Sequence, residues 1–410
     1  MRDVRRANRS SLLTDLFHGG RQSRQQLGDT TALSQASVSN LIGEMIDEGL
    51  VEEAGLVGSD GGRPRALLRV APGYGYVVGA DVGETHVTVE LYDLAMSRLG
   101  AANYQLEDGR DQDEAAARLL DGLAAVTHEA GVEVGEVLGY GVGVAGVVDQ
   151  TGADAVVHSQ TTGWDAVPLG ALLKAGTEVP VFVENGAKTV GQAEMWFGAG
   201  RGARHAVIVM IGRGVGAAVV MDGRSYRGAN SNAGEWGHTT LVYDGDLCRC
   251  GARGCLEAYI GADKVNQKLA DALGLDFDPM LMRRLLTGPI EGPAAPVIDE
   301  MVGQLGAGIA GLINLFSPER IVLGGRAGLA LGERFLPDIR AAAARNALRQ
   351  PYSKTRIDLC QLGPDAIAMG AATLPIARLL TDGGLPAVAD PATPAFSRAA
   401  HRRQVSRGRS

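Results

Sequence analysis

Two glycine-rich segments that share one plan constrain the fold of this chain more than any other feature. The first starts at Tyr74 and reads YGYVVGADVGETHVTVELYD, and the second starts at Arg204 and reads RHAVIVMIGRGVGAAVVMDG. Each predicts a strand, a glycine turn and a second strand, followed by helical stretches and a further apolar strand, VLGYGVGVAGVVD in the first half and RIVLGGRAG in the second. Duplicated units of this kind indicate two α/β lobes that face each other across a cleft. The glycine turns would line that cleft, because glycine lets backbone N–H groups approach phosphates or sugars closely.

The length and composition of the chain indicate a folded protein of more than one domain. At 410 residues it exceeds what one hydrophobic core organises, and a hydrophobic content of 45% is enough for two or three domains. No apolar run approaches the roughly 18 residues of a membrane-spanning helix, and the N-terminal MRDVRRANRS has no apolar segment behind its arginines. We therefore expect a cytoplasmic protein without a membrane segment. The net charge of −8 argues against nucleic-acid binding by the whole surface, but it leaves room for a local DNA-binding module.

Residues 1 to 70 contain three short helical patterns followed by a turn-rich segment. Asn8 or Ser10 can cap the first helix, Ser23 and Gln26 form a capping-box pattern at the second, and Ser34 can cap the third. The third pattern carries an apolar stripe of helical period, formed by Val38, Leu41, Ile42, Met45 and Ile46. The segment SDGGRPRALLRV then predicts a glycine-proline turn and a short strand.

This N-terminal order fits either a small helical domain or a winged helix-turn-helix, in which the third helix enters the DNA major groove. Small polar residues at the start of the third helix favour the second interpretation, because side chains of a recognition helix meet base edges there. The arginines of GGRPR favour it too, since this extended segment suits a narrow groove. The expected DNA-binding residues are Gln35, Ser37, Ser39, Asn40, Arg63 and Arg65.

Three of the four cysteines lie close together in GEWGHTTLVYDGDLCRCGARGCLEAYIG. Four cysteines are too few for a disulfide scaffold in a chain of this length. His238, Cys248, Cys250 and Cys255 offer one imidazole and three thiolates, which is a closed tetrahedral set for zinc. A closed set leaves no position for water, so the zinc would be structural. The alternative is a loop with three ordinary cysteines.

Two carboxylates are tethered to this cysteine loop. Glu235 lies three residues before His238, and Glu257 lies two residues after Cys255. Together with Asn185 they offer acceptors and donors of the kind that hold vicinal hydroxyl groups, and a zinc-bound His238 would present its second ring nitrogen to the cleft. Each glutamate taken separately could equally be a solvated surface acid.

These motifs together resemble the ROK family, a group of transcriptional repressors and sugar kinases. The resemblance covers residues 1 to about 375 and rests on GADVGETH, GVAGVVD, TTGWDAVPL, VENGA, RGANSNAGEWGH, CRCGARGCLE and IVLGGR. The most specific of these is E-x-G-H followed by C-x-C-G-x-x-G-C-x-E. The N-terminal helical segment is typical of the regulator branch, which includes repressors of the xylose, N-acetylglucosamine and glucose type.

The resemblance implies an α/β protein in which a winged helix-turn-helix precedes a two-lobed actin-like (ribonuclease-H-like) ATPase fold. We expect a DNA-binding domain at 1–72, a sensor domain at 73–376 with lobes at 73–200 and 201–376, and a disordered basic tail at 377–410. The resemblance also implies self-association as dimers or tetramers, structural zinc at the four predicted ligands, and sugar contacts from Asn185, Glu235, His238 and Glu257.

The chain departs from the kinases of the family at the positions that perform phosphoryl transfer. Gly186 stands where those kinases carry a general-base aspartate after the asparagine of VENGA. In the first phosphate loop, D-x-G-G-T-K in the kinases, Glu84 replaces the second glycine and His86 replaces the lysine. Arg213 replaces a small hydroxyl residue in the second loop, where it could still hold an anion. A carboxylate next to a triphosphate is repulsive, so we expect poor ATP binding and no kinase activity.

The sequence therefore predicts a sugar-responsive DNA-binding regulator. It favours a repressor of carbohydrate-utilisation genes over an activator. Its expected partners are operator DNA and a mono- or oligosaccharide effector. The alternative is an active ATP-dependent sugar kinase with an accessory DNA-binding domain. The sequence leaves open which sugar binds and whether that sugar is phosphorylated.

Overall fold

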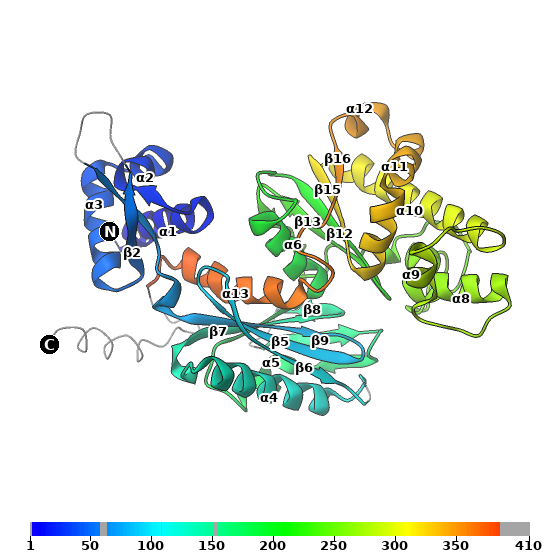
Figure 1. Ribbon diagram of the computed structural model, residues 1–410, viewed down its shortest axis with the longest axis horizontal. Coiled ribbons are helices and arrows are strands. Elements are labelled where there is room, and N and C mark those ends of the chain that lie inside the picture. The colour runs from blue at the N-terminus through cyan, green and yellow to red at the C-terminus, as the bar shows by residue number, and fades with distance from the viewer. Residues whose placement is uncertain (1, 58–63, 108, 151–153, 386–410) are drawn as a thin grey trace.

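The computed structural model describes residues 2–57, 64–107, 109–150 and 154–385. Figure 1 shows three bodies: an N-terminal module in blue, a first lobe in cyan and teal, and a second lobe in green to orange. A long helix near the C-terminus, α13 (Ile367–Thr381), lies on the first-lobe sheet, and its C-terminal end reaches the module. Within the described ranges, no helix is both long enough and apolar enough to cross a membrane.

The N-terminal module consists of three helices and a small sheet. Its elements are α1 (Arg2–Gly19), β1 (Gln22–Ser23), α2 (Arg24–Thr31), α3 (Gln35–Asp47), β2 (Val51–Val57) and β3 (Arg65–Val70). The strands pair in the order β1-β3-β2, and both pairings of β3 are antiparallel. The buried core of the module includes Leu12, Leu16, Leu27, Val38, Ile42 and Met45. This order and pairing are those of a winged helix-turn-helix, as predicted.

The predicted start signals of the second and third helices are confirmed. The hydroxyl of Ser23 accepts a hydrogen bond from the backbone of Gln26, and the side chain of Gln26 accepts one from the backbone of Ser23. The hydroxyl of Ser34 accepts a hydrogen bond from the backbone of Ser37. These caps satisfy backbone N–H groups that have no partner within a helix.

The predicted start of the first helix is wrong, because α1 begins at Arg2 and contains Asn8 and Ser10 in its interior. The early turns are held by the Arg9 side chain, which is fully buried. Its guanidinium lies 2.5 Å from the Glu48 carboxylate and donates a 2.9 Å hydrogen bond to the carbonyl of Gly383. Both partners are distant in sequence, so no local pattern revealed them.

The first lobe is built on a five-stranded sheet in the order β11-β7-β4-β5-β6. Its strands are β4 (Tyr76–Val82), β5 (His86–Asp93), β6 (Arg98–Gln105), β7 (Val137–Val144) and β11 (Val181–Asn185). The helices α4 (Gln112–Ala130) and α5 (Leu169–Lys174) cover one face of this sheet, and α13 covers the other. A small sheet of β8 (Val147–Asp149), β9 (Val156–Ser159) and β10 (Trp164–Val167) extends the lobe.

The second lobe repeats the first sheet strand for strand, in the order β14-β13-β12-β15-β16. Its strands are β12 (Ala206–Ile211), β13 (Val215–Met221), β14 (Arg224–Ser225), β15 (Arg320–Gly324) and β16 (Arg356–Leu359). Its helices are α7 (Glu257–Ile260), α8 (Ala262–Leu273), α9 (Leu281–Leu286), α10 (Ala294–Phe316), α11 (Arg326–Asn346) and α12 (Arg349–Tyr352). In each lobe three strands are antiparallel and two more join in parallel. The duplication predicted from the two glycine-rich segments is confirmed.

Two helices pack against each other at the centre of the molecule. These are α6 (Gly186–Phe197), which contacts β12 and β13 of the second lobe, and α13, which lies on the first-lobe sheet. They approach so closely that a Cβ at residue 370 would collide with the carbonyl oxygen of Thr189. The side chain of Gln192 donates a 2.8 Å hydrogen bond to the hydroxyl of Thr373. The two helices therefore form one rigid unit between the lobes.

The predicted tail boundary is wrong, because residues 377–385 belong to the folded part of the chain. α13 continues to Thr381, and Leu379 and Leu380 are buried against the N-terminal module. Beyond the helix, Asp382 forms a 3.4 Å ion pair with Arg6 of α1. The apolar partners of this segment lie at the other end of the chain, which is why its composition alone suggested disorder. The rest of the predicted tail, 386–410, lies outside the described residues.

Candidate functional site

A large cavity of about 950 Å³ lies between the two lobes. It is of the size that small-molecule ligands need, roughly 300–1,000 Å³. The first lobe lines it with the turn after β4 and the ends of β7 and β11, and the second lobe with the β12–β13 turn, the cysteine loop and the start of α8. The cavity is therefore the cleft that the duplicated glycine turns predicted.

The four side chains expected to contact a sugar all line this cavity. Asn185 ends β11, and Glu257 begins α7. Glu235 directly precedes a short 3₁₀ turn at Trp236–His238, and His238 is the last residue of that turn. They come from both lobes and surround the cavity with amide, imidazole and carboxylate groups. The interpretation of the two glutamates as solvated surface acids is wrong, since Glu257 is buried and Glu235 is half-buried.

Asn185 is the N-cap of α6, which limits what it can offer a ligand. Its side-chain oxygen accepts hydrogen bonds from the backbone N–H groups of Ala187 and Lys188, at 2.9 and 3.2 Å. Its side-chain nitrogen donates to the carbonyl of Gly146 at 2.6 Å. An amide nitrogen carries two hydrogens, so one N–H remains for a ligand. Asn185 can therefore serve as a donor, whereas both lone pairs of its oxygen are used.

The two glutamates of the cleft are held differently. One carboxylate oxygen of Glu257 accepts a 2.8 Å hydrogen bond from the backbone of Val215, and the other lies 3.3 Å from the Arg249 guanidinium. Burial raises the pKa of Glu235, and the charges of His238 and Lys188 oppose that shift. Glu257 is thus fixed in position, while Glu235 has more freedom to accept a hydrogen bond from a ligand hydroxyl.

Glu184 links the end of β11 to the second lobe. Its carboxylate is buried, accepts a 2.9 Å hydrogen bond from the backbone of Asn185, and lies 2.7 Å from the guanidinium of Arg227 in the second lobe. Arg227 also donates a 2.8 Å hydrogen bond to the side chain of Gln150 in the first lobe. This lobe-to-lobe contact was missed from the sequence, although Arg227 opens the motif RGANSNAGEWGH.

Gly186 is the first residue of α6 and faces the cavity. A Cβ at this position would lie 3.4 Å from the Ile367 side chain and 3.5 Å from the carbonyl oxygen of Val144. These are ordinary van der Waals separations, so a Cβ is tolerated at this position. Packing therefore does not require glycine at the position where an aspartate was expected for a kinase.

Charged groups fill the part of the cleft where the two glycine turns meet. The Glu84 carboxylate of the first lobe lies 2.6 Å from the Arg213 guanidinium and 3.4 Å from that of Arg249. Arg213 also donates a 2.9 Å hydrogen bond to Asp263 of α8. Burial raises the pKa of Glu84, and the two arginines oppose that shift. The anion expected beside Arg213 is thus provided by the chain itself.

The four predicted zinc ligands form one cluster. Their ligand atoms all lie within 4.8 Å of one another, and the Nδ1 atom of His238 lies 3.7 Å from the Cys248 sulfur. Gly251 and Gly254 have positive φ angles of 89° and 76°, which permit the tight loop around the cluster. Burial raises the pKa of the Cys248 thiol to about 12. One imidazole and three thiols at this separation match the tetrahedral donor set of a structural zinc site.

Four of the six predicted DNA-binding residues are exposed at the surface of the module. Gln35, Ser39 and Asn40 of α3 are exposed, as is Arg65 at the start of β3. Ser37 is half-buried and its hydroxyl lies 2.9 Å from the hydroxyl of Ser34, so it belongs to the helix cap. Arg63 lies outside the described residues.

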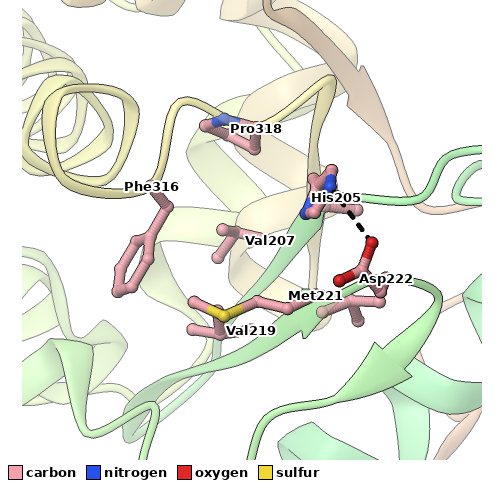
Figure 2. Close-up of a pocket in the computed structure, with 9 residues that line it drawn as sticks. His205, Val207, Val219, Met221, Asp222, Phe316 and Pro318 are labelled. Atoms are coloured by element: carbon pink, nitrogen blue, oxygen red, sulfur yellow. Dashed lines mark ion pairs between the residues drawn. The ribbon is translucent and has the colours of Figure 1, made fainter.

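A second hollow of about 240 Å³ lies where β12 begins and β13 ends, at the strand ends away from the cleft. Figure 2 shows that its labelled residues are mainly apolar, including Val207, Val219 and Phe316. His205 lies there 3.7 Å from Asp222, which also forms a 2.5 Å ion pair with Arg204. The larger cleft, with its convergent polar groups, is the better candidate for a ligand site.

Comparisons with known proteins agree with the fold and with the motifs. The model of the ROK family matches residues 77–378. The xylose repressor of Caldicellulosiruptor bescii is 28% identical over 390 residues, and the alignment covers 92% of this chain and 97% of the repressor. The similarity to this repressor therefore includes the N-terminal module.

Two solved structures are similar to this chain to different extents. The crystal structure of a ROK family transcriptional regulator, a homolog of the E. coli MLC protein, has a TM-score of 0.77 at 25% identity and covers 93% of this chain and 98% of its own. A ROK family glucokinase from Streptomyces griseus, in complex with glucose and AMPPNP, has a TM-score of 0.64 at 25% identity. The glucokinase match covers 73% of this chain and 99% of the glucokinase. The regulator matches nearly the whole chain, and the kinase matches only part of it.

The cluster of His238 and the three cysteines predicts that the purified protein contains zinc. Wild-type protein should carry zinc that survives gel filtration, and Cys250→Ser should lower zinc affinity by about a hundredfold or more, because a thiolate ligand is lost. Cys360→Ser is the matched control, since Cys360 lies outside the cluster and donates to Glu194 instead. Zinc content is measured by plasma mass spectrometry. Equal zinc in the two variants, or a zinc-free wild type, would contradict the assignment.

Proposed function

The chain belongs to the ROK family, and we propose that it is a sugar-responsive DNA-binding regulator, a repressor of carbohydrate-utilisation genes. One observation carries this proposal: a winged helix-turn-helix is joined to a two-lobed body with a polar cleft, and a ROK transcriptional regulator matches this whole arrangement. The similarity to a xylose repressor over 92% of the chain supports the repressor role.

The proposed partner of the module is operator DNA in the cytoplasm. α3 enters the major groove, where Gln35, Ser39 and Asn40 contact base edges. Arg65, at the start of β3, contacts the DNA backbone or the minor groove. Each module reads half of a near-palindromic operator, so the active species is a homodimer or homotetramer. Light scattering after gel filtration tests this part, and a monomer that still binds operator would refute it.

The proposed effector is a mono- or oligosaccharide in the cleft. Asn185 supplies a donor, Glu235 and Glu257 supply acceptors, and a zinc-bound His238 presents its second ring nitrogen. The support for this assignment is that all four line one cavity from two lobes. A sugar that touches both lobes would favour one degree of lobe closure over another.

Two helices connect the cleft to the DNA-binding module. α6 begins at Gly186 in the cleft and ends beside α1, where the Trp196 ring lies 5.5 Å from Phe17 and 4.8 Å from His18. α13 begins at Ile367, which also lines the cleft, and its far end packs on α1. Because α6 and α13 are packed as one unit, a change in lobe closure moves the module. This is the proposed two-state element on which the sugar acts.

The proposed protein is not a kinase. Gly186 supplies no general base, the Glu84 carboxylate repels the phosphates of a nucleotide, and His86 replaces the lysine that would attract them. The alternative, an active sugar kinase with an accessory module, is favoured only by the similarity to the glucokinase over part of the chain.

The DNA-binding proposal predicts distinct effects for two substitutions in gel retardation with the DNA that flanks the gene. Asn40→Ala should cost about 1–3 kcal/mol of operator binding and relax sequence preference. Arg65→Ala should weaken binding to all sequences and reduce the salt dependence. Arg204→Ala is the control, since this arginine is exposed in the second lobe and paired with Asp222. Absent retardation, or an equal loss in the control, would overturn the proposal.

The connection through α6 predicts that sugar response can be separated from binding. A thermal-shift screen of mono- and oligosaccharides and their phosphates first identifies a ligand that stabilises the native state. That ligand should weaken operator binding by about tenfold in the wild type. Trp196→Ala should bind both operator and sugar but show little release, whereas Trp196→Phe should respond normally because it keeps an aromatic contact. A normal response in Trp196→Ala would exclude this route.

The absence of kinase activity is tested with purified protein, ATP and a panel of hexoses and pentoses. We expect no turnover above the background hydrolysis of ATP. Gly186→Asp should also be inactive, although a Cβ at this position meets no close contact, because Glu84 still repels ATP and the lysine of the first phosphate loop is still absent. Sugar-dependent turnover at ordinary kinase rates, on the order of 1–100 per second, would establish the alternative function.

A further inference from the structure

The Glu84 side chain crosses the cleft from one lobe to the other. Glu84 stands in the turn between β4 and β5, and its side chain is 14% exposed. Both of its carboxylate oxygens face second-lobe arginines: one lies 2.6 Å from Arg213 and the other 3.4 Å from Arg249. The carboxylate therefore lies between two guanidinium groups that belong to the opposite lobe.

These two arginines are held in place by other contacts. Arg213 donates to Asp263 at 2.9 Å, and Arg249 lies 3.3 Å from Glu257 and donates to the backbone carbonyl of Arg213 at 2.8 Å. Two guanidinium groups fixed in this way, and aimed at one point, form a receptor for an oxyanion such as a phosphate or a carboxylate. In this chain the oxyanion in the receptor is the side chain of Glu84.

The charge of the rest of the cavity opposes a second anion. With His86, His158 and His238 counted as neutral, the whole lining contains six carboxylates, Glu84 among them, and four arginines, which is a formal excess of two negative charges. The carboxylates are Asp81, Glu84, Glu235, Glu257, Asp263 and Asp365. Arg326 is also engaged, at 2.5 Å from Asp365. A phosphorylated ligand would meet a negative field unless it displaced Glu84.

Displacement of Glu84 would be costly. The carboxylate is largely buried, and it would lose both arginines while Asp263 remains nearby, paired with Arg213. An uncharged polyol does not require Glu84 to be displaced. Its hydroxyl groups can form hydrogen bonds with Glu235, Glu257 and the free N–H of Asn185 while the ion pairs stay intact.

We propose that Glu84 is an internal oxyanion that occupies the arginine receptor of the cleft, so that the cleft accepts uncharged carbohydrate and excludes phosphorylated sugars and nucleotides. The same contact ties the first lobe to the second. This inference rests on the proposed function, since it names the chemical class of the effector in the proposed sugar cleft.

The test is binding of inorganic pyrophosphate, measured by isothermal titration calorimetry at low salt. Wild-type protein should not bind it measurably. Glu84→Gln and Glu84→Gly each remove the internal anion and should gain at least about tenfold in pyrophosphate affinity, because a like charge next to the receptor is lost. The gain should shrink as salt is added. Two variants are used so that misfolding of one leaves the other to decide the question.

Two controls connect any gain to the receptor. Glu129→Gln removes one negative charge from an exposed position on α4 of the same lobe and should leave pyrophosphate binding absent. Adding Arg213→Ala to Glu84→Gln should abolish the gain. Pyrophosphate binding to the wild type as tight as to the Glu84 variants, or no gain in either folded variant, would overturn the inference.

A separate measurement distinguishes this inference from the proposed function. In the thermal-shift screen, each neutral sugar is compared with its phosphate on the wild-type protein. Stabilisation by a neutral sugar but not by its phosphate supports both proposals. Stabilisation by the phosphate alone would refute the role of Glu84 and leave a sugar-responsive regulator intact. If no sugar of either kind stabilises the protein and no operator is retarded, the proposed function fails, while the pyrophosphate titrations still decide whether Glu84 occupies the receptor.

Discussion

The close packing of α6 against α13 is the constraint on which the rest of this structure depends. No Cβ fits at residue 370, where α13 meets the backbone of Thr189 in α6. The first-lobe sheet is packed just as closely beneath, because a Cβ at Gly141 would collide with the carbonyl of Ala371. Helices that are fixed in this way cannot slide independently, since a well-packed interior changes between discrete arrangements and does not deform continuously. The cleft and the N-terminal module therefore both contact the same packed pair of helices.

The cleft lies in a fold that is shared with a glucokinase, and it has its own distribution of charge. Its turns and its place between two duplicated sheets are those of a fold shared with a glucokinase. Its arginines, however, are neutralised by the chain's own carboxylates, with Glu84 as the partner that reaches across from the other lobe. Interactions between charges at 3 to 4 Å are strong in a partly buried site, so a few substitutions change which ligand the same shape can hold.

Features that depend on neighbours in sequence could be predicted from the sequence. The capping box at Ser23 needs only a residue three positions ahead, and the cluster of His238 with three cysteines needs only the spacing of these four residues. The duplicated sheets followed from two similar segments, because each encodes the same strand order. Features that depend on distant partners were missed or misread. The start of α1 depends on Arg9 and Glu48, and the folded end of the chain depends on its contact with α1.

By itself, the sequence determined the family, the two-lobed α/β architecture behind a winged helix-turn-helix, and which side chains meet in the cleft. The two lobes follow from a duplicated strand order, whereas the family and the set of cleft side chains follow from motifs that resemble the ROK family. Only the tertiary structure decided how those side chains are used: Asn185 holds the start of α6 with its oxygen, Glu184 reaches Arg227, and Glu84 pairs with Arg213 and Arg249. The reason is that a hydrogen bond or an ion pair is defined by distances of a few ångströms between segments that the sequence keeps far apart.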